Sequence, residues 1–323
     1  MAHHPEIIRE AREQYREAVR VFNEKEEAKK KSLLEQSPRL QETAAELDRL
    51  SLRMAHAALM GLPTEIPKIR QQAEEIHQKQ GDILEEMGEN RDALRPHYMC
   101  PLCEDSGSTG KGNCSCLMSV YTERMLKRYQ MYLGNAELGN LQMDLFSTAL
   151  GANGVSPRIL IDYAADICRR YAEEFCEGQA GGLFIYGACG VGKSFLAAGT
   201  VRRIIERGYY VHCISATELF SIYERSRFGR CEASEKAMLD ACFEADLLFL
   251  DDLGSEVASA HNAPFLARLL NERINRQKGT ILVAQCMDAD ELARRYSAQI
   301  RSRVKGSFTE MMILGNDLRN TAK

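Results

Sequence analysis

The stretch that decides the fold of this chain is Gly182-Leu-Phe-Ile-Tyr-Gly187-Ala-Cys-Gly190-Val-Gly192-Lys193-Ser194. Its apolar half predicts a buried strand, and its glycines predict a turn into a helix, in the G-x-x-x-x-G-K-[ST] spacing of a P-loop. Glycines let the loop wrap a phosphate, and backbone N–H groups converge on the anion at the helix N-terminus. Lys193 is expected to reach the β- and γ-phosphates of ATP, and the Ser194 hydroxyl to bind Mg²⁺. The predicted nucleotide-binding loop comprises Gly187, Ala188, Cys189, Gly190, Val191, Gly192, Lys193 and Ser194.

A second motif lies downstream, where the apolar run Leu247-Leu-Phe-Leu ends in Asp251 and Asp252. Two acids at the end of a strand are also an ordinary turn signal. After a P-loop, however, a buried strand that ends in acids has the pattern of a Walker B motif, which brings carboxylates to the same edge of the sheet. We expect Asp251 to hold Mg²⁺ through water, and Asp252 to position or polarise the attacking water.

Helices and strands alternate from Ser156 onward, which predicts a parallel α/β sheet covered by helices on both faces. Further strands are expected at residues 209–215, 280–285 and 308–314. Gln285, at the end of one of these strands, is a candidate sensor of the γ-phosphate.

Basic residues gather late in the chain, with Arg301, Arg303 and Lys305 near the end of a predicted helix and Arg319 after the last strand. Arginines at such positions often complete an ATP site across a subunit interface. A solvated basic face is the alternative interpretation, and the residues alone do not separate the two.

The composition limits the remaining choices. The chain has 323 residues, of which 45% are hydrophobic, which is enough for two or three domains with a real core. With a net charge of −4 and a pI near 6.1, the chain as a whole has no electrostatic attraction to nucleic acid or to an anionic membrane, so any basic surface must be local. The start of the chain lacks the apolar core of a signal peptide, and no uncharged apolar run approaches the length of a membrane span. We therefore expect a cytoplasmic protein with no membrane partner.

The first part of the chain, residues 5–94, is rich in charge and carries apolar residues at three- and four-residue steps, which predicts amphipathic helices. Pro38, Pro63 and Pro67 interrupt this pattern, so we expect three helices. The three apolar stripes are Ile8, Ala11, Tyr15, Ala18 and Phe22; Leu40, Ala44, Leu47, Leu50 and Met54; and Ile69, Ala73, Ile76, Ile83 and Met87. A small antiparallel bundle or coiled coil and a protein-docking module remain equally open.

Four of the eleven cysteines, Cys100, Cys103, Cys114 and Cys116, fall close together in the sequence. A Cys-x-x-Cys pair makes a tight knuckle, and a second pair would complete a tetrahedral shell around Zn²⁺. The second pair is Cys-x-Cys, which is tighter than usual. A redox pair is the alternative, but this Cys-x-x-Cys does not open a helix in a βαβ unit. We expect a closed, structural zinc site that folds a segment too small to have its own core.

These patterns predict four regions. Residues 1–95 form a helical region for docking a partner, residues 96–118 a zinc knuckle, residues 119–155 a helical linker and residues 156–323 an ATPase domain.

Taken together, the motifs resemble the AAA+ bacterial replicative helicase loaders of the DnaC/DnaI type. The resemblance covers residues 98–323. Besides the P-loop and Walker B motifs, it rests on several motifs in a fixed order along the chain. The first, Cys100-Pro-Leu-Cys103-Glu-Asp-Ser-Gly107 with Cys114-Ser-Cys116-Leu, looks like the zinc knuckle of Gram-positive-type members. The others are Tyr171-Ala-Glu-Glu-Phe175, Asp251-Asp-Leu-Gly-Ser-Glu256, Asn271-Glu-Arg273 and Gly315-Asn-Asp317-Leu-Arg319.

The resemblance implies an ATPase with an AAA+ domain that delivers a hexameric DNA helicase onto single-stranded DNA, with residues 1–95 gripping the helicase. It implies a nucleotide-dependent homo-oligomer in which Arg303 is the arginine finger for a neighbour and Arg319 is the second sensor of its own subunit. The chain departs from the family at Gln285-Cys286, where relatives commonly carry Ser/Thr-Asn. Because cysteine is a poor hydrogen-bond donor, Gln285 must substitute or the first sensor is degraded, and we expect slow hydrolysis.

Single-stranded DNA is expected to contact the segment between the second and third strands of the domain. Arg225, Arg227 and Arg230 offer cations for phosphates, and Phe228 offers a ring for base stacking. An exposed loop with incidental charge is the alternative.

Two other functions stay open. A transposition-helper AAA+ ATPase would have a similar ATPase domain, although the zinc knuckle and helical N-terminus favour the loader. A nucleotide-gated adaptor that binds ATP with little turnover would suit the altered first-sensor position. A small-molecule kinase and an ABC-type ATPase are disfavoured, because no acceptor lid and no signature loop are recognised.

Overall fold

The structure is a computed structural model that describes residues 3–151, 154–178, 181–257, 259, 261–286 and 290–320. The chain divides into two compact units, one formed by Arg12–Leu117 and the other by Met1–Ala11 together with Met118–Lys323. The division into the regions 1–95, 96–118, 119–155 and 156–323 stays a prediction.

The larger unit is built on a sheet of five parallel strands in the order β4-β5-β6-β3-β7. The strands are β3 (Gly182–Gly187), β4 (Val211–Ser215), β5 (Leu247–Leu253), β6 (Gly279–Ala284) and β7 (Phe308–Ile313). The central strands read as continuous apolar runs because helices cover both faces of the sheet. The predicted parallel α/β domain is confirmed.

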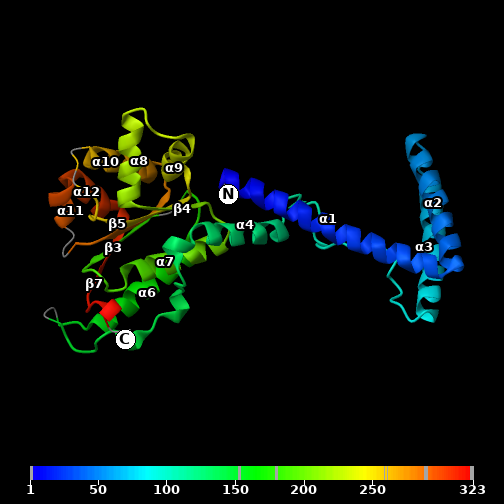
Figure 1. Ribbon diagram of the computed structural model, residues 1–323, viewed down its shortest axis with the longest axis horizontal. Helices are drawn as coiled ribbons and strands as arrows, with labels where there is room; N and C mark the ends of the chain where they lie inside the picture. The colour runs from blue at the N-terminus through cyan, green and yellow to red at the C-terminus, as the bar shows by residue number, and fades with distance from the viewer. Residues whose placement is uncertain are drawn as a thin grey trace. The chain divides into compact units, whose positions relative to one another are not determined.

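Helices form a layer on each side of this sheet (Figure 1). One layer contains α6 (Pro157–Glu174) and α7 (Lys193–Glu206), and the other contains α8 (Ala216–Arg227), α9 (Ala233–Glu244), α10 (Asn262–Asn275), α11 (Glu291–Arg295) and α12 (Ala298–Ser307). The apolar side chains between the second layer and the sheet form one continuous core. This core holds the strand ends that carry the predicted site in place.

Arg273, from one of the family-like motifs, lies within this core and is fully buried. Its guanidinium donates to the carbonyl oxygens of Cys242 at 2.8 Å and Ala245 at 3.0 Å, and its Nε lies 3.0 Å from the Thr280 hydroxyl. Arg273 therefore joins the end of α9 to the start of β6, which is a structural role.

The segment before the sheet contains α4 (Ser115–Arg128), α5 (Gln130–Leu133) and the short 3₁₀ helices Leu138–Asn140 and Met143–Leu145. A further 3₁₀ helix, Leu318–Asn320, follows β7. Two tyrosines of this segment point inward: Tyr121 of α4 is fully buried, and the hydroxyl of Tyr129, which precedes α5, lies 3.0 Å from His212 Nδ1. Basic residues of α4 pair with acids in the first turns of α1: Arg128 lies 3.0 Å from Glu6, and Arg124 lies 2.5 Å from Glu10. These two tyrosines therefore belong to the core.

The smaller unit contains most of α1 (Pro5–Gln36), together with α2 (Pro38–Leu59) and α3 (Glu65–Glu86). As predicted, a proline separates the first two helices: Ser37 caps α2 by accepting from the Leu40 N–H, and Pro38 is the first residue of that helix. Figure 1 shows α2 and α3 side by side, and their contact is apolar, formed by Leu50, Ala57, Ile69 and Ile76.

The same unit holds the short hairpin of β1 (Ser108–Thr109) and β2 (Gly112–Asn113), which lies between the two cysteine pairs. Within the part of the chain that the structure describes, no helix is both long and apolar enough to span a bilayer.

Candidate nucleotide-binding site and cysteine cluster

The predicted P-loop connects the end of β3 to the start of α7. Gly192, at the N-cap of α7, has a φ of 97°, and Gly190 has a φ of 77°. Both values fall in the left-handed region that glycine tolerates. A Cβ atom on Gly190 would overlap the Asp317 carboxylate, so a larger residue there would also displace that side chain. The loop thus ends at a helix N-terminus, where free N–H groups and the helix dipole favour a phosphate.

Lys193 is 6% exposed, and its Nζ donates to the Ala188 carbonyl oxygen at 2.5 Å. Burial lowers the pKa of Lys193, and the neighbouring carboxylates of Asp252 and Asp251 oppose this shift. A partly desolvated ammonium at the base of a cavity interacts strongly with an anion, because water screens it less. Lys193 is therefore positioned to exchange a carbonyl for a phosphate oxygen.

Asp251 belongs to β5, and its Oδ1 accepts from the Ser194 hydroxyl at 3.2 Å and from the Asp252 N–H at 2.9 Å. The hydroxyl and the carboxylate that the two motifs predicted as Mg²⁺ ligands therefore meet directly. Burial raises the pKa of Asp251, and the Ser194 hydroxyl and the Asp252 N–H oppose it. A divalent cation would offset the cost of this buried charge.

Asp252 has a φ of 58°, in the left-handed region that is uncommon for residues with a side chain. The register between β5 and β6 shifts between Leu250 and Leu253, so Asp252 lies at an irregularity of the ladder. Its carboxylate accepts from Gln285 Nε2 at 2.5 Å. The predicted water-positioning acid and the predicted phosphate sensor therefore form one hydrogen-bonded pair.

A cavity of about 510 Å³ contains these groups. This volume is within the range of small-molecule sites. The cavity is lined by Cys189, Gly190, Gly192, Lys193, Ser194, Phe195, Asp251, Asp252, Val283, Gln285, Leu318 and Arg319. Three residues of the predicted nucleotide-binding loop, Gly187, Ala188 and Val191, do not line this cavity.

The end of the chain reaches the P-loop through Leu318 and Arg319. The Leu318 N–H donates to the Gly190 carbonyl oxygen at 3.0 Å, and Arg319 Nη2 lies 3.0 Å from Cys189 Sγ. The Arg319 side chain thus lines the cavity while it stays 70% exposed. Sequence reasoning missed Leu318 as a lining residue, because an apolar side chain after a strand carries no signal of its own.

Arg303 is exposed on α12 and is not part of the lining. Among the described residues it makes no hydrogen bond or ion pair, whereas its neighbour Arg301 pairs with Asp290 at 3.1 Å and Glu310 at 2.5 Å. Of these two arginines, Arg303 is the one available to another molecule.

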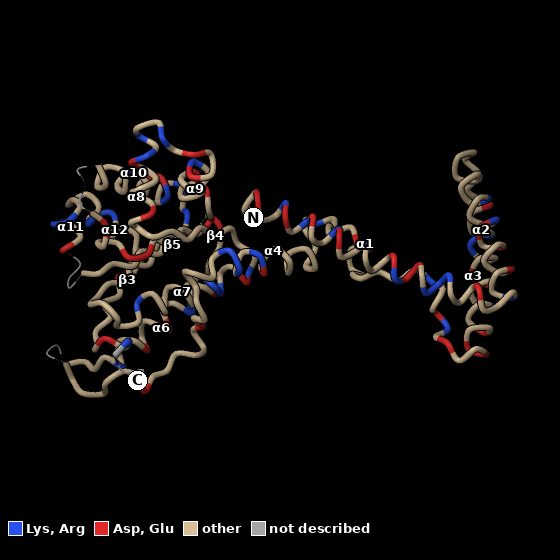
Figure 2. The backbone as a smooth tube through the Cα atoms, in the orientation of Figure 1, with Lys and Arg blue, Asp and Glu red and all other residues tan. Residues whose placement is uncertain are grey.

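The predicted DNA-contacting segment covers the end of α8 and the turn toward α9, where Figure 2 shows basic residues in blue. Phe228 is 64% exposed, and the Arg227 guanidinium lies 5.9 Å from the centre of its ring. Arg230 is also exposed. Arg225 differs, because its guanidinium is held by Glu235 at 2.5 Å.

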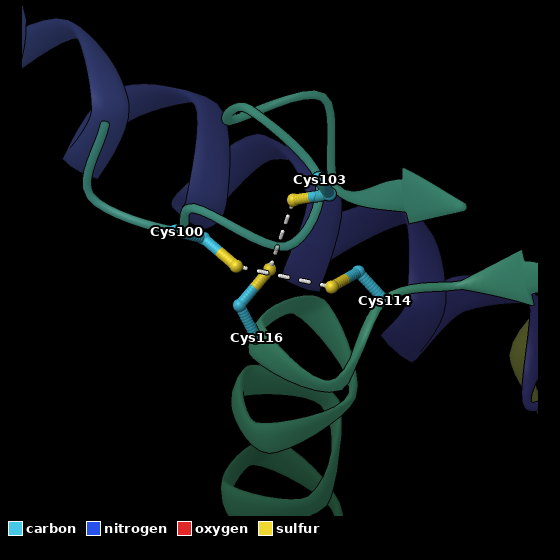
Figure 3. A group of neighbouring side chains, drawn as sticks. All are labelled: Cys100, Cys103, Cys114 and Cys116. Carbon is cyan, nitrogen blue, oxygen red and sulfur yellow. Dashed lines mark hydrogen bonds between the residues drawn. The ribbon is translucent and has the colours of Figure 1, made fainter. Parts of the chain in front are cut away.

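The four predicted metal ligands, Cys100, Cys103, Cys114 and Cys116, converge in the smaller unit (Figure 3), with all four Sγ atoms within 4.8 Å of one another. The separations are 3.9 Å for Cys100–Cys114 and 3.5 Å for Cys103–Cys116. A tetrahedral zinc site with Zn–S bonds of about 2.3 Å has sulfurs about 3.8 Å apart, so this donor set fits zinc. Four protein ligands leave no open position for a substrate.

The loop geometry supports this convergence. Asp105, with a φ of 62°, accepts from the Cys100 N–H at 2.7 Å and from the Met99 N–H at 3.0 Å. The Asp105 carboxylate therefore fixes the turn that contains the first two cysteines by binding the backbone N–H groups of Met99 and Cys100. Tyr15, which the sequence placed only in an apolar stripe, has its hydroxyl 3.2 Å from Cys116 Sγ.

The sheet order, the P-loop and the acidic strand end define the larger unit as an AAA+ P-loop domain of the ATP-binding kind. The chain belongs to the family of IstB-like ATP binding proteins, whose model matches residues 122–289. The curated relatives that it matches are named as DnaC helicase loaders, in line with the resemblance seen in the motifs.

Among curated proteins, the replicative helicase loader DnaC of Escherichia coli (strain K12) is 24% identical over 150 residues, which are 46% of this chain and 57% of that protein. The DnaC of Buchnera aphidicola subsp. Acyrthosiphon pisum is 27% identical over 112 residues, or 35% of this chain and 45% of that protein. The chain thus spans about half the length of the curated relatives it matches.

Among solved structures, "Crystal structure of the DnaC helicase loader" has a TM-score of 0.46 and 21% identity, covering 57% of this chain and 99% of that one. "Crystal Structure of the DnaI" has a TM-score of 0.47 and 23% identity, covering 59% and 93%.

Proposed function

We propose that this protein is an ATP-dependent loader that binds a hexameric replicative DNA helicase and places it on single-stranded DNA. The observation that carries the proposal is the cavity in which Lys193, Ser194, Asp251 and Arg319 meet. Membership of an ATP-binding family supports ATP binding, and the matches to DnaC proteins support the choice of a loader. A cytoplasmic location goes with this function.

In the proposed site, the N–H groups of the P-loop and the Lys193 ammonium bind the phosphates. Ser194 and Asp251 hold Mg²⁺, which neutralises phosphate charge during hydrolysis. Asp252 orients the attacking water, and Gln285 holds Asp252 and responds to the γ-phosphate. Because Cys286, a poor hydrogen-bond donor, stands at the altered first-sensor position, hydrolysis is slow and ATP serves mainly as a conformational switch.

The proposed switch depends on a homo-oligomer. The free guanidinium of Arg303 would reach the γ-phosphate of a neighbouring subunit, and Arg319 would turn from Cys189 toward the phosphate of its own subunit. The phosphate state would then alter contacts both within and between subunits.

Partner binding is proposed at two regions. Residues 1–95 dock the helicase, and the exposed group Arg227, Phe228 and Arg230 contacts single-stranded DNA through charge and base stacking. Arg225 has a smaller part in DNA binding than the sequence predicted, because Glu235 holds its guanidinium. Zinc at the four cysteines folds the segment of residues 96–118 and takes no part in hydrolysis.

Light scattering on a sizing column tests this function. The protein is mixed with the replicative helicase of its host, with and without ATP, and compared with a variant that lacks residues 1–95 and with Lys193→Ala. A discrete complex that disappears with the deletion and responds to ATP only when Lys193 is present supports the loader. If no complex forms with any nucleotide, while DNA-stimulated assembly with a transposase occurs, the function is that of a transposition helper. A complex without ATP turnover, even with DNA, indicates a nucleotide-gated adaptor.

A further inference from the structure

Tyr15 of α1 lies against the cysteine cluster and is 4% exposed. Its hydroxyl is 3.2 Å from Cys116 Sγ and 3.7 Å from Cys103 Sγ. Figure 3 shows α1, in blue, passing beside the four cysteines. Its ring packs on Gly107, where an added Cβ would lie 3.3 Å from the ring.

The chemistry of the cluster explains why a hydroxyl is useful there. Four thiolates around one divalent cation leave a net charge of about −2, and such a charge is costly in a buried place unless donors stabilise it. Metal-bound thiolates carry no proton, so the Tyr15 hydroxyl must be the donor. It has a single proton, and Cys116 is the nearer sulfur. The Ser115 hydroxyl lies farther from its sulfur partner, at 4.0 Å from Cys114 Sγ.

Other contacts in this unit hold α1 beside the same segment. Arg12 donates to the Asn113 side chain at 3.2 Å, and Glu26 pairs with His97 at 3.3 Å. Both pairs are partly or fully exposed, and exposed pairs contribute little to stability. Of these three polar links between α1 and the segment of residues 96–118, the hydroxyl–sulfur contact is the buried one.

We propose that Tyr15 is a positioning residue of the metal site, which donates a hydrogen bond to the Cys116 thiolate, tightens metal binding and thereby links metal occupancy to the packing of α1. The inference rests on the proposed zinc site. It goes beyond that site by assigning a partner from a helix about a hundred positions away in the chain.

The test uses the full-length protein and the variant Tyr15→Phe, which keeps the ring and removes one oxygen. Zinc affinity is measured by competition with a chromophoric chelator, and Co²⁺ is added separately to record the sulfur-to-metal charge-transfer bands. We expect Y15F to bind zinc about 10- to 100-fold more weakly and to shift the Co²⁺ bands, as loss of an outer-shell partner does elsewhere. Tyr98→Phe is the matched control, since Tyr98 is near Cys100 in sequence but 43% exposed, and it should leave both readings unchanged.

Equal zinc affinity and equal Co²⁺ spectra in Y15F and the wild type would overturn the role of Tyr15 and leave the zinc site intact. Folding of metal-loaded Y15F is measured by far-UV circular dichroism. If the variant does not fold, Tyr15 has a packing role, and this result also counts against the proposal. A wild-type protein that binds neither metal would remove the zinc site itself. ATP binding is measured on the same samples, so each of these failures is distinguishable from failure of the nucleotide site.

Discussion

The side-chain amide of Gln285 donates to the carboxylate of Asp252 at 2.5 Å, although the two residues belong to different strand ends. This contact joins the acid that would orient water to the group that would sense the γ-phosphate. In the sequence, Gln285-Cys286 was a departure from the family pattern. In the structure, the Gln285 side chain lines the cavity and donates to Asp252, while Cys286 is buried.

Replacing Gln285 by Leu should lower turnover while leaving ATP binding nearly unchanged. The reason is that the amide contacts Asp252 rather than the P-loop, so its loss acts on the water-positioning acid. We expect kcat to fall by roughly 10²-fold, the typical cost of losing one preorganised donor. Phosphate release by the assembled complex measures the effect. Gln299→Leu, an exposed position on α12, is the control. Equal loss of ATP affinity and turnover would contradict the assignment.

The pKa of Asp251 makes a prediction about stability. Burial raises this pKa above the ordinary value of 3.8, so the unfolded chain loses the proton at lower pH than the folded protein. The free energy of unfolding contributed by Asp251 therefore falls as pH rises from about 3.8 through the raised pKa.

Asp251→Asn should accordingly stabilise the Mg²⁺-free protein at neutral pH, by about 2–4 °C in Tm if about 1 kcal/mol is recovered. The gain should vanish below the ordinary carboxyl pKa, and Mg²⁺ should no longer stabilise the variant. Thermal melts at several pH values, with and without Mg²⁺, check this. Asp240→Asn, at an exposed position on α9, should show no gain. A D251N variant that is less stable than the wild type at neutral pH would count against a buried carboxylate.

How much of this site was predictable depends on how local each feature is. The P-loop is one continuous stretch of sequence, and so is the strand that ends in acids. The chemistry expected of each follows from the local order of strand, turn and helix, so the elements that carry them were predicted closely. The contacts of Gly190 with Asp317 and of Cys189 with Arg319 join positions far apart in the chain. A periodic pattern of apolar residues does not predict contacts between side chains so far apart in the sequence.

The N-terminal helix shows the same limit in another way. Its predicted stripe includes Tyr15, which is buried, and Ala18, which is exposed. Periodicity identified the face of the helix but not how far along it a partner packs. It also could not tell that the hydroxyl of Tyr15 meets two cysteines.

Arg303→Ala should leave folding and ATP binding by the single subunit unchanged, since its side chain is exposed and makes no polar contact among the described residues. Turnover of the assembled oligomer should fall by about 10³-fold or more, as when an arginine finger is lost. Mixing the variant with a Walker B variant, Asp252→Ala, tests action in trans. Arg301→Ala is the contrasting variant, because it breaks ion pairs with Asp290 and Glu310 and should instead lower the free energy of unfolding by roughly 1–3 kcal/mol.

Phe228→Ala should weaken binding of single-stranded oligonucleotides, because an exposed ring offers a stacking surface worth about 1–3 kcal/mol per base. We expect a 5- to 100-fold loss in affinity, equal for different sequences, by fluorescence anisotropy at fixed salt. Tyr163→Ala is the matched control, since Tyr163 is 62% exposed on α6, in the opposite helical layer. If Y163A loses as much as F228A, the stacking surface is elsewhere.

The central claim is that the cavity at the end of β3 and β5 binds Mg²⁺–ATP through Lys193, and isothermal titration calorimetry tests it most directly. Wild-type protein should bind one ATP per chain in the presence of Mg²⁺. Lys193→Ala should lose this binding while keeping its far-UV circular dichroism, and Lys236→Ala, on the exposed face of α9, should bind as the wild type does. Undiminished ATP binding by K193A, or none by the wild type, would contradict the account.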